Sequence, residues 1–174
     1  GCFVIYSNRN TDSRGYFEKD YSEEIFKMAG LNTCWVQENT SFTQKKGSLR
    51  GLHLQVGQIG EIKRIKCLRG KIFEVFLDLR RESSTFGEWI SINLEEDSGV
   101  QIYLPGGIAH GFQTLEDDVL LRYSHNVEYQ PSASKTINCK DPRLNISWPL
   151  SISNISESDK NAPNLGEFVK TNVM

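Results

Sequence analysis

Apolar and polar residues alternate in short segments along most of the chain. Each segment is bounded by Gly, Pro, Asp or Ser, and the clearest are residues 71–79 (KIFEVFLDL), 88–94 (EWISINL), 100–104 (VQIYL) and 119–127 (VLLRYSHNV). Such alternation is typical of β-strands. Residues 21–30 (YSEEIFKMAG) have the pattern of a short helix, with Ser22 as its N-cap and Gly30 as its stop. Many short strands with little helix predict a sandwich or a barrel.

The length of 174 residues fits one domain with a single core. We therefore expect one domain over residues 1–174, with a barrel over about residues 35–130 and a polar, irregular tail after Pro149. The formal net charge of -2 argues against bulk electrostatic binding to nucleic acid or to an anionic membrane. No apolar run approaches the roughly 20 residues that span a bilayer, and the first residues lack the features of a signal peptide.

The four cysteines, Cys2, Cys34, Cys67 and Cys139, are widely spaced. They form no CxxC pair and have no zinc-site spacing. We expect reduced thiols in a cytoplasmic protein, because cysteine usage follows the redox state of the compartment.

The stretch from Gly99 to His110 has the spacing of the second cupin signature. Gly99 is followed by five residues, Pro105, one residue, Gly107, two residues and His110. Only the final Asn is missing, because Thr114 stands in its place. This spacing predicts a strand that ends at Pro105, a glycine-bearing turn, and a next strand that points the ring of His110 into the barrel.

The first cupin signature is present in altered form. His53 stands at the first ligand position, but Gln55 and Lys63 stand where a metal-binding cupin has a second His and a Glu. An ammonium cannot ligate a divalent metal, and an amide is a poor substitute for imidazole. We therefore predict a mainly β, metal-free cupin barrel whose lumen holds His53, Lys63 and His110, with Arg50 near the mouth. Ionisable groups converging on one cavity indicate a site for an anionic substrate or intermediate.

Longer motifs resemble the dTDP-4-dehydrorhamnose 3,5-epimerase family over nearly the whole chain. They are LRGLHLQ (residues 49–55), VFLDLR followed by SSTFGEW (75–89), LPGGIAHGF (104–112), DSRGYFE (12–18), VQENTS (36–41), KDPRLNISWPL (140–150) and SESDKNAP (156–163). The run of LRGLH, AHGF and DP-x-L-x-I-x-WP in this order and spacing is highly specific.

The resemblance implies an isomerase that needs no cofactor. The family removes the protons at C3 and C5 of a dTDP-linked 4-keto-6-deoxyhexose through an enolate and returns them on the other face, on the way to L-rhamnose-like sugars of lipopolysaccharide. His53 matches the general base, and Asp159 matches the carboxylate that orients it. Lys63 matches the cation beside the ketone oxygen, and Tyr123 matches the proton donor on the opposite sugar face.

The resemblance further implies residues that contact the substrate, namely Arg14, Phe17, Glu18, Gln37, Asn39, Arg50, His110 and Tyr129. The two arginines match contacts to the nucleotide diphosphate, and Gln37 and Asn39 match polar residues near the sugar and nucleotide. Tyr129 matches a second tyrosine lining the cavity, and His110 a supporting histidine. Phe17 and Glu18 match a segment that reaches into a neighbouring subunit's site. A homodimer is therefore expected, with the N-terminal segment at the dimer contact and the C-terminal tail packed on the site.

Departures from the family's pattern lie near the expected sugar and nucleotide contacts. Ser158 stands where a basic residue is usual, NCKD (138–141) replaces a Trp-Asn-Asp run, and Glu128 replaces the first of two tyrosines. The nucleotide (dTDP, CDP or GDP), the number of carbons inverted and a 3,4-ketoisomerase reaction stay open. A metal-dependent cupin is disfavoured by Gln55 and Lys63. A non-catalytic sugar-binding cupin is disfavoured because both the base and the acid are present.

Overall fold

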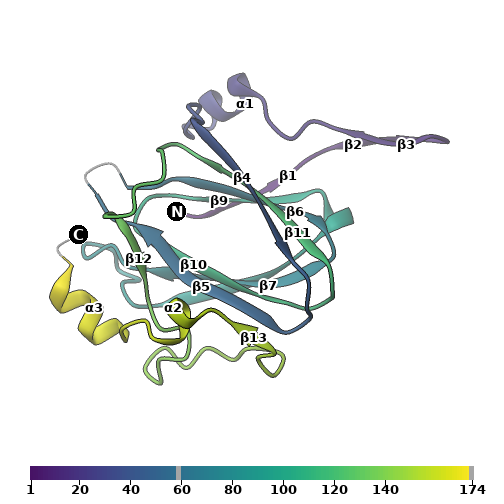
Figure 1. The fold of residues 1–174 in the computed structure, drawn as a ribbon. Helices are drawn as coiled ribbons and strands as arrows, with labels where there is room; N and C mark the ends of the chain where they lie inside the picture. Colours follow the sequence, from purple (N-terminus) through teal and green to yellow (C-terminus); the bar gives the residue numbers. More distant parts are fainter. Residues whose placement is uncertain (58–59, 173–174) are drawn as a thin grey trace.

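A computed structural model describes residues 1–57 and 60–172, and most of its elements are strands (Figure 1). The strands are β1 (Phe3–Tyr6), β2 (Arg9–Asp12), β3 (Gly15–Glu18), β4 (Gln37–Thr43), β5 (Ser48–Gln55), β6 (Lys63–Arg69), β7 (Lys71–Asp78), β8 (Trp89–Glu95), β9 (Val100–Leu104), β10 (Ile108–Thr114), β11 (Val119–His125), β12 (Ser134–Thr136) and β13 (Asn154–Ile155). The helices are α1 (Glu23–Met28), α2 (Glu157–Lys160) and α3 (Leu165–Thr171), with a 3-10 turn, η1, at Glu96–Ser98.

The strands form two sheets that face each other and one separate hairpin. The first sheet has the order β1-β9-β6-β11-β4, and the second has the order β12-β5-β10-β7-β8, with β13 beside β5. The hairpin β2–β3 extends away from both sheets, as Figure 1 shows. This arrangement confirms the predicted mainly β, cupin-type barrel. None of the helices in the described part of the chain is long and apolar enough to cross a membrane.

The inner core fills part of the space between the two sheets. Its side chains come from the inward positions of strands in both sheets, and they include Ile65, Ile72, Phe76, Ile102, Leu104, Phe112, Leu121 and Tyr123. Alternation along each strand sends every second side chain inward, which is why the sequence pattern predicted these strands. The remaining space between the sheets is lined by polar side chains and forms the cavity described below.

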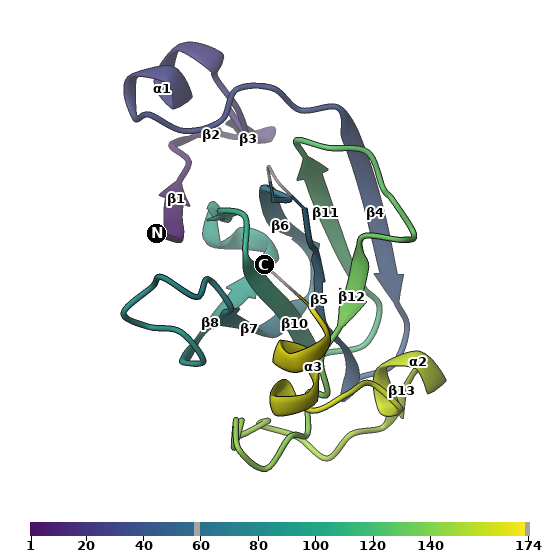
Figure 2. The same ribbon diagram turned by 90° about the vertical axis from the view of Figure 1, so that its left-hand side faces the viewer.

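A second core covers the outer face of the second sheet. Leu52, Val75 and Ala109 on that face pack in one cluster with Ile137 and Phe168 from the C-terminal part of the chain. Figure 2 shows α3 lying against this sheet. Burying apolar surface contributes roughly 25 cal/mol per Å². The C-terminal segment is therefore attached to the barrel by hydrophobic packing.

The observed elements refine the sequence predictions at their ends. Strand β9 has the predicted bounds, and the other three predicted strands differ by a few residues. Ser22 occupies the N-cap position of α1, but its side chain makes no capping hydrogen bond. Gly30 has a positive φ of 68°, as a glycine that ends a helix requires.

The prediction of an irregular tail after Pro149 is wrong, because β13, α2 and α3 form there. Ser156 caps α2 by accepting the backbone N–H of Asp159, and Asn164 with Glu167 forms a capping box at α3. Phe168 is the buried residue of α3. The polar composition of this segment gives no apolar periodicity that would predict these short helices. Only their capping residues indicate them.

Strands β5 and β10 approach each other closely at two glycines. A Cβ atom on Gly111 would lie 2.6 Å from the carbonyl oxygen of Arg50, and one on Gly51 would lie 2.6 Å from the Cα atom of Gly111. Nearby, four residues of β5 (Arg50 to His53) lie opposite three residues of β10 (Phe112 to His110), which marks a bulge. Residues three apart in a regular strand face opposite sides, but the bulge places Arg50 and His53 on the same side of the sheet.

We predict that Gly111→Ala destabilises the protein by about 3 kcal/mol, because the added methyl group would force two paired strands apart. Urea unfolding measures the change. Gly166→Ala in α3 is the matched control: its Cβ meets only the Arg143 guanidinium, at 3.0 Å, which can move. Alanine also favours a helix by about 1 kcal/mol over glycine. Equal stability of the two variants would contradict the close packing of β5 on β10.

Candidate active site

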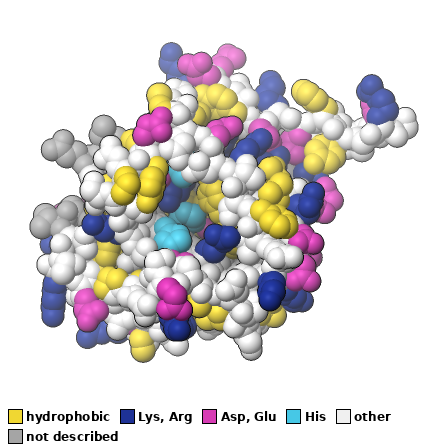
Figure 3. All heavy atoms as spheres, viewed as in Figure 1, with side chains coloured by type: hydrophobic (Ala, Val, Ile, Leu, Met, Phe, Trp, Pro, Cys, Tyr) yellow, Lys and Arg dark blue, Asp and Glu magenta, His cyan; other side chains and the backbone are white. Residues whose placement is uncertain are grey.

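A cavity between the two sheets collects ionisable side chains. It is lined by Asn39, Ser41, Arg50, His53, Lys63, His110, Gly111, Phe112, Tyr123 and His125. All three histidines of the chain therefore lie together. Figure 3 shows histidine side chains in a hollow near the centre of one face of the molecule, with basic side chains beside them.

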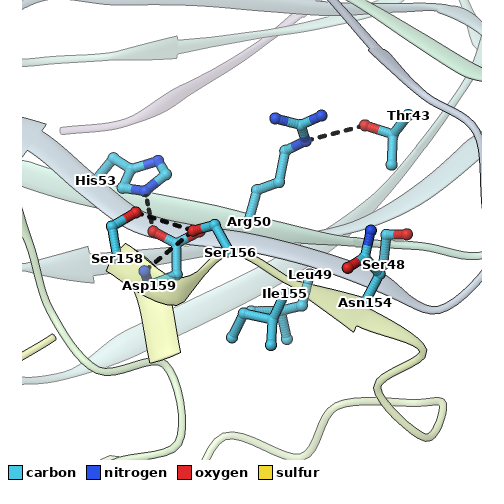
Figure 4. Close-up of a pocket in the computed structure, with 10 residues that line it drawn as sticks. All are labelled: Thr43, Ser48, Leu49, Arg50, His53, Asn154, Ile155, Ser156, Ser158 and Asp159. Carbon is cyan, nitrogen blue, oxygen red and sulfur yellow. Dashed lines mark hydrogen bonds and ion pairs between the residues drawn. The ribbon is translucent and has the colours of Figure 1, made fainter. Parts of the chain in front are cut away.

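His53 forms a short contact with a carboxylate from the C-terminal segment. Its Nε2 atom lies 2.6 Å from Oδ1 of Asp159, which sits in α2 (Figure 4). Strand β13 runs parallel to β5 immediately before α2. The pairing of these two strands brings α2 beside His53, so the tail supplies a residue to the site.

The electrostatic surroundings of Asp159 define the protonation of His53. Burial alone would raise the pKa of Asp159, but hydrogen bonds from His53 and from the backbone N–H of Gly51, together with the attraction of the imidazole, lower it overall. Asp159 is therefore a carboxylate at neutral pH and can only accept a hydrogen bond. The proton of the neutral ring is then on Nε2, and Nδ1 is the basic nitrogen of His53.

Tyr123 and Lys63 face the cavity from the sheet opposite His53. Tyr123 lies on β11 and Lys63 on β6, whereas His53 lies on β5 of the other sheet. Burial raises the pKa of Tyr123 well above its ordinary value. Tyr123 is thus a protonated phenol at neutral pH, as a proton donor must be. A base and an acid face the same cavity from opposite sheets.

His110 is paired with a buried carboxyl group. Its Nδ1 atom lies 2.7 Å from Oε1 of Glu74, and Glu74 is fully buried. Burial raises the pKa of Glu74 well above its usual range and lowers the pKa of His110 well below its own. The pair is therefore uncharged at neutral pH. A protonated Glu74 donates to Nδ1, which leaves the remaining N–H of His110 on Nε2.

Glu61 joins two residues on the wall opposite His53. Its Oε1 atom lies 2.8 Å from Nδ1 of His125, and its Oε2 atom lies 3.0 Å from Nζ of Lys63. Burial alone would raise the pKa of Glu61, but the His125 hydrogen bond and the Lys63 charge lower it to about 2. The carboxylate is therefore ionised at neutral pH, and it offsets the charge of Lys63 in this buried place.

Arg50 connects the cavity to a second hollow at its mouth. This hollow is lined by Thr43, Ser48, Leu49, Arg50, His53, Asn154, Ile155, Ser156, Ser158 and Asp159 (Figure 4). Arg50 and His53 line both spaces. The Nε atom of Arg50 donates to the hydroxyl of Thr43 at 3.0 Å, which holds the guanidinium over the mouth. A positive group among hydroxyls suits phosphate oxygens.

The β2–β3 hairpin carries three of the predicted site residues away from the cavity of their own chain. Arg14 is exposed near the hairpin tip and pairs with Asp12, and Phe17 is 71% exposed. Glu18 accepts from Nζ of Lys66 at 2.7 Å, on the outer side of the first sheet. Glu18 therefore anchors the hairpin to its own chain.

Gln37 and Tyr129 also lie outside the residues that line the cavity. The side chain of Gln37 accepts the backbone N–H of Tyr129 at 2.8 Å. The ring of Tyr129 is 59% exposed. The structure thus brings together His53, Asp159, Lys63, Tyr123, Asn39, Arg50 and His110, and it leaves Arg14, Phe17, Glu18, Gln37 and Tyr129 apart from them. Their predicted roles stay predictions.

The two residues at the altered metal-ligand positions, Gln55 and Lys63, both contact Glu61. Gln55 donates to Oε1 of Glu61 at 2.9 Å, and Lys63 pairs with Oε2 of the same carboxylate. Within residues 1–57 and 60–172, no group of three His, Cys, Asp or Glu side chains is placed to hold a metal ion.

Comparison with known proteins identifies the family. The family model described as dTDP-4-dehydrorhamnose 3,5-epimerase matches residues 1–167. An enzyme of that name from Methanothermobacter thermautotrophicus is 38% identical over 164 residues, which are 92% of this chain and 88% of the relative. The chain belongs to the dTDP-4-dehydrorhamnose 3,5-epimerase family. Members of this family are isomerases.

Solved structures of epimerases share the fold. A dTDP-6-deoxy-D-glucose-3,5-epimerase from Legionella pneumophila, in complex with dTDP-4-keto-L-rhamnose, has a TM-score of 0.88 and 34% identity, covering 95% of this chain and 88% of that one. A 3'-monoepimerase from Streptomyces bikiniensis, in complex with dTDP-quinovose, has a TM-score of 0.92 and 31% identity, covering 98% and 87%. This chain is therefore similar both to double epimerases and to a single epimerase.

Three ionisable residues of the site escaped the sequence analysis: His125, which lines the cavity, and Glu61 and Glu74, which contact residues that line it. Glu74 had a signal, because it is a charged residue inside an otherwise apolar strand. His125 had a weaker one, since it lies two residues after Tyr123 and so on the same side of β11. Glu61 lies outside the strands, and only the folded chain shows its partners.

We predict that Glu61 makes stability depend on acidic pH. Its folded pKa of about 2 lies below the usual 4.5, so between these values the unfolded chain binds a proton that the folded chain does not. The resulting stabilisation, about 3 kcal/mol, is complete above the unfolded pKa and is lost as the pH falls towards the folded one.

Urea unfolding of wild type and Glu61→Gln at several pH values measures this contribution. The free energies of unfolding of the two proteins should differ by about 3 kcal/mol at about pH 7. At about pH 3 the difference should be less than half of that value. A difference that stays constant over this range would mean that the Glu61 charge does not stabilise the fold.

Proposed function

We propose that the chain inverts C3, C5 or both carbons of a dTDP-linked 4-keto-6-deoxyhexose, in the synthesis of a deoxysugar such as L-rhamnose. The observation that carries the proposal is the placement of His53 and Tyr123 on opposite sheets of one cavity. Inversion requires a proton to leave one face of a carbon and another to arrive on the opposite face. A flat enolate held between a base and an acid meets this requirement.

His53 removes the proton from the sugar carbon next to the ketone. Its Nδ1 atom holds the free lone pair, because Nε2 donates to the carboxylate of Asp159. As the ring accepts a proton it becomes a cation, and Asp159 stabilises that cation at 2.6 Å. The pair therefore combines a proton-accepting nitrogen with a fixed ring orientation.

Lys63 stabilises the enolate oxygen that forms when the proton leaves. Lys63 is only 6% exposed and lines the cavity on the sheet opposite His53. A cation already fixed in a water-poor site stabilises developing negative charge without reorganisation. The neutral His110 offers its Nε2–H to the same cavity and supports this role.

Tyr123 returns a proton to the carbon from the other face. Its phenol is protonated at neutral pH because burial raises its pKa. Proton transfer to the carbanion leaves a phenolate, which solvent reprotonates between turnovers, while the His53 imidazolium releases its proton to solvent. The ring lies between two imidazoles, with centroid distances of 5.9 Å to His110 and 6.2 Å to His125. These contacts hold it in place for the transfer.

The hollow at the mouth suits the nucleotide diphosphate. Arg50 supplies the positive charge there, beside the hydroxyls of Thr43, Ser156 and Ser158. A solved relative from Bacillus anthracis carries TDP and PPi, which supports a dTDP substrate over the CDP and GDP alternatives. The four free thiols support a reducing compartment, and we place the reaction in the cytoplasm.

We further propose that the chain works as a homodimer in which each hairpin completes the site of its partner. The hairpin extends from the barrel, and it carries Arg14 and the 71% exposed Phe17 away from their own cavity. Exposed large apolar residues on a projecting element are typical of an interface. Glu18 and Lys66 fix the base of this element to the barrel.

Proton NMR in heavy water tests the reaction with dTDP-4-keto-6-deoxyglucose. Deuterium entering at both C3 and C5 marks a 3,5-epimerase, and deuterium at one carbon marks a single epimerase. His53→Ala should lower the exchange rate by about 100-fold or more, since it removes the base. Tyr123→Phe should keep exchange and lose epimerised product, since it removes only the acid.

Tyr103→Phe is the matched control for Tyr123→Phe. Tyr103 is also buried, but its hydroxyl accepts the backbone N–H of Asn32 outside the cavity. This variant should epimerise like wild type. Exchange at the wild-type rate by His53→Ala would show that another group is the base.

Mixing inactive variants tests the shared site. A subunit with Arg14→Ala and Phe17→Ala keeps its own His53, and a His53→Ala subunit keeps its hairpin. Random hybrid dimers of the two should recover about a quarter of wild-type activity, because half are hybrids and each has one complete site. Mixing His53→Ala with Tyr123→Phe is the control, and it should recover less. Equal, negligible recovery in both mixtures would refute the hairpin exchange.

A further inference from the structure

Glu61 holds a cluster of side chains that the proposed proton transfers leave unexplained. The carboxylate is 8% exposed and precedes β6, at the end of the cavity wall opposite His53. It accepts from Gln55 at 2.9 Å and from Nδ1 of His125 at 2.8 Å, and it forms an ion pair with Lys63 at 3.0 Å. Burying a carboxylate is costly, and these contacts compensate for that cost.

Despite its contact with Glu61, the ammonium of Lys63 can still donate a hydrogen bond to a substrate in the cavity. Oε2 of Glu61 lies 3.0 Å from Nζ of Lys63, so this charged contact engages one side of the ammonium. The ammonium carries three N–H donors. Glu61 therefore fixes the position of Nζ by charge and takes one N–H group, while the other N–H groups can point towards a substrate oxygen.

The contact to His125 fixes which ring nitrogen faces which partner. An ionised carboxylate can only accept, so Nδ1 of His125 carries the proton. The other nitrogen, Nε2, is then an acceptor, and the amide nitrogen of Asn39 donates to it at 3.2 Å. Both His125 and Asn39 line the cavity. A hydroxyl group can take the place of the amide N–H, because it is also a hydrogen-bond donor.

The ring of His125 also packs against the ring of Tyr123. The two rings are stacked, with an interplanar angle of 28° and centroids 6.2 Å apart. They project from the same side of β11, two residues apart. A shift of His125 would therefore disturb the phenol that faces the base across the cavity.

We infer that Glu61 is a positioning residue that sets Lys63 and His125 against the substrate, and that Nε2 of His125 accepts a hydrogen bond from a hydroxyl group of the sugar. This inference rests on the proposed epimerase function. Glu61 acts through its two partners and does not touch the sugar. His125 binds the sugar on the wall opposite His53, next to the residue that returns the proton.

Two substitutions separate the positioning role of Glu61 from the sugar contact of His125. Glu61→Gln removes the charge that positions Lys63, and its single carbonyl oxygen cannot serve all three partners. His125→Asn retains an N–H close to the place of Nδ1, so the bond to Glu61 is kept while the Nε2 acceptor is lost. The matched control is Asp78→Asn, which alters another buried carboxylate that accepts from Arg80 and Ser83 outside the cavity.

Steady-state epimerisation by folded variants, with deuterium exchange measured alongside, gives the test. We expect Glu61→Gln to lower kcat by about 10-fold or more, because less charge stabilisation reaches the enolate. We expect His125→Asn to raise KM by about 10-fold, because a hydrogen bond to bound sugar is lost. The double variant should lose less than the product of the two losses, since the residues act as one unit. Asp78→Asn should keep kcat and KM.

The outcomes separate this inference from the reaction on which it rests. An active wild type with kcat and KM unchanged in both variants would overturn the inference alone, and Glu61 would then only stabilise the fold. If the loss in the double variant equals the product of the losses in the two single variants, the coupling of the two residues is overturned. If Glu61→Gln does not fold, a normal KM in His125→Asn suffices to overturn the sugar contact. A wild type without exchange on 4-keto sugars would overturn the proposed function itself.

Discussion

The site depends on the close approach of β5 and β10 at Gly51 and Gly111. Backbone atoms of the two strands meet where any side chain would separate them. The bulge next to this contact turns both Arg50 and His53 towards the cavity, although they are three residues apart. One local irregularity thus places a phosphate-binding candidate and a base on the same wall. A regular strand would have directed one of them into the outer core.

The two sheets contribute different functional groups to the cavity. The second sheet holds His53 and His110, each paired with a carboxyl group. The first sheet holds Lys63, Tyr123 and His125. The pairs on the second sheet differ in charge, because Asp159 is ionised whereas burial keeps Glu74 protonated. An imidazole paired with a carboxylate therefore lies on the same sheet as a neutral hydrogen-bond donor, and both face a cation and a phenol across the cavity.

The sequence predicted the architecture, and it named six of the residues that line the cavity: Asn39, Arg50, His53, Lys63, His110 and Tyr123. Alternation predicted the strands because their inner side chains form the core, and the cupin spacing correctly placed His110 at the start of β10. The partners of the histidines were harder to find. Asp159 is brought to His53 by β13 and α2, which a polar composition concealed. Glu61 meets His125 only through tertiary packing, at a separation of 64 residues, which no local pattern encodes.

The central claim is that the sugar lies between His53 on one sheet and Tyr123 on the other. A crystal structure of the protein with dTDP-quinovose tests this most directly, because a sugar without a 4-ketone can bind but not react. The account predicts C3 and C5 between Nδ1 of His53 and the hydroxyl of Tyr123, with O4 towards Lys63. A sugar ring with His53 and Tyr123 on the same face would contradict it, and so would a sugar bound outside the cavity.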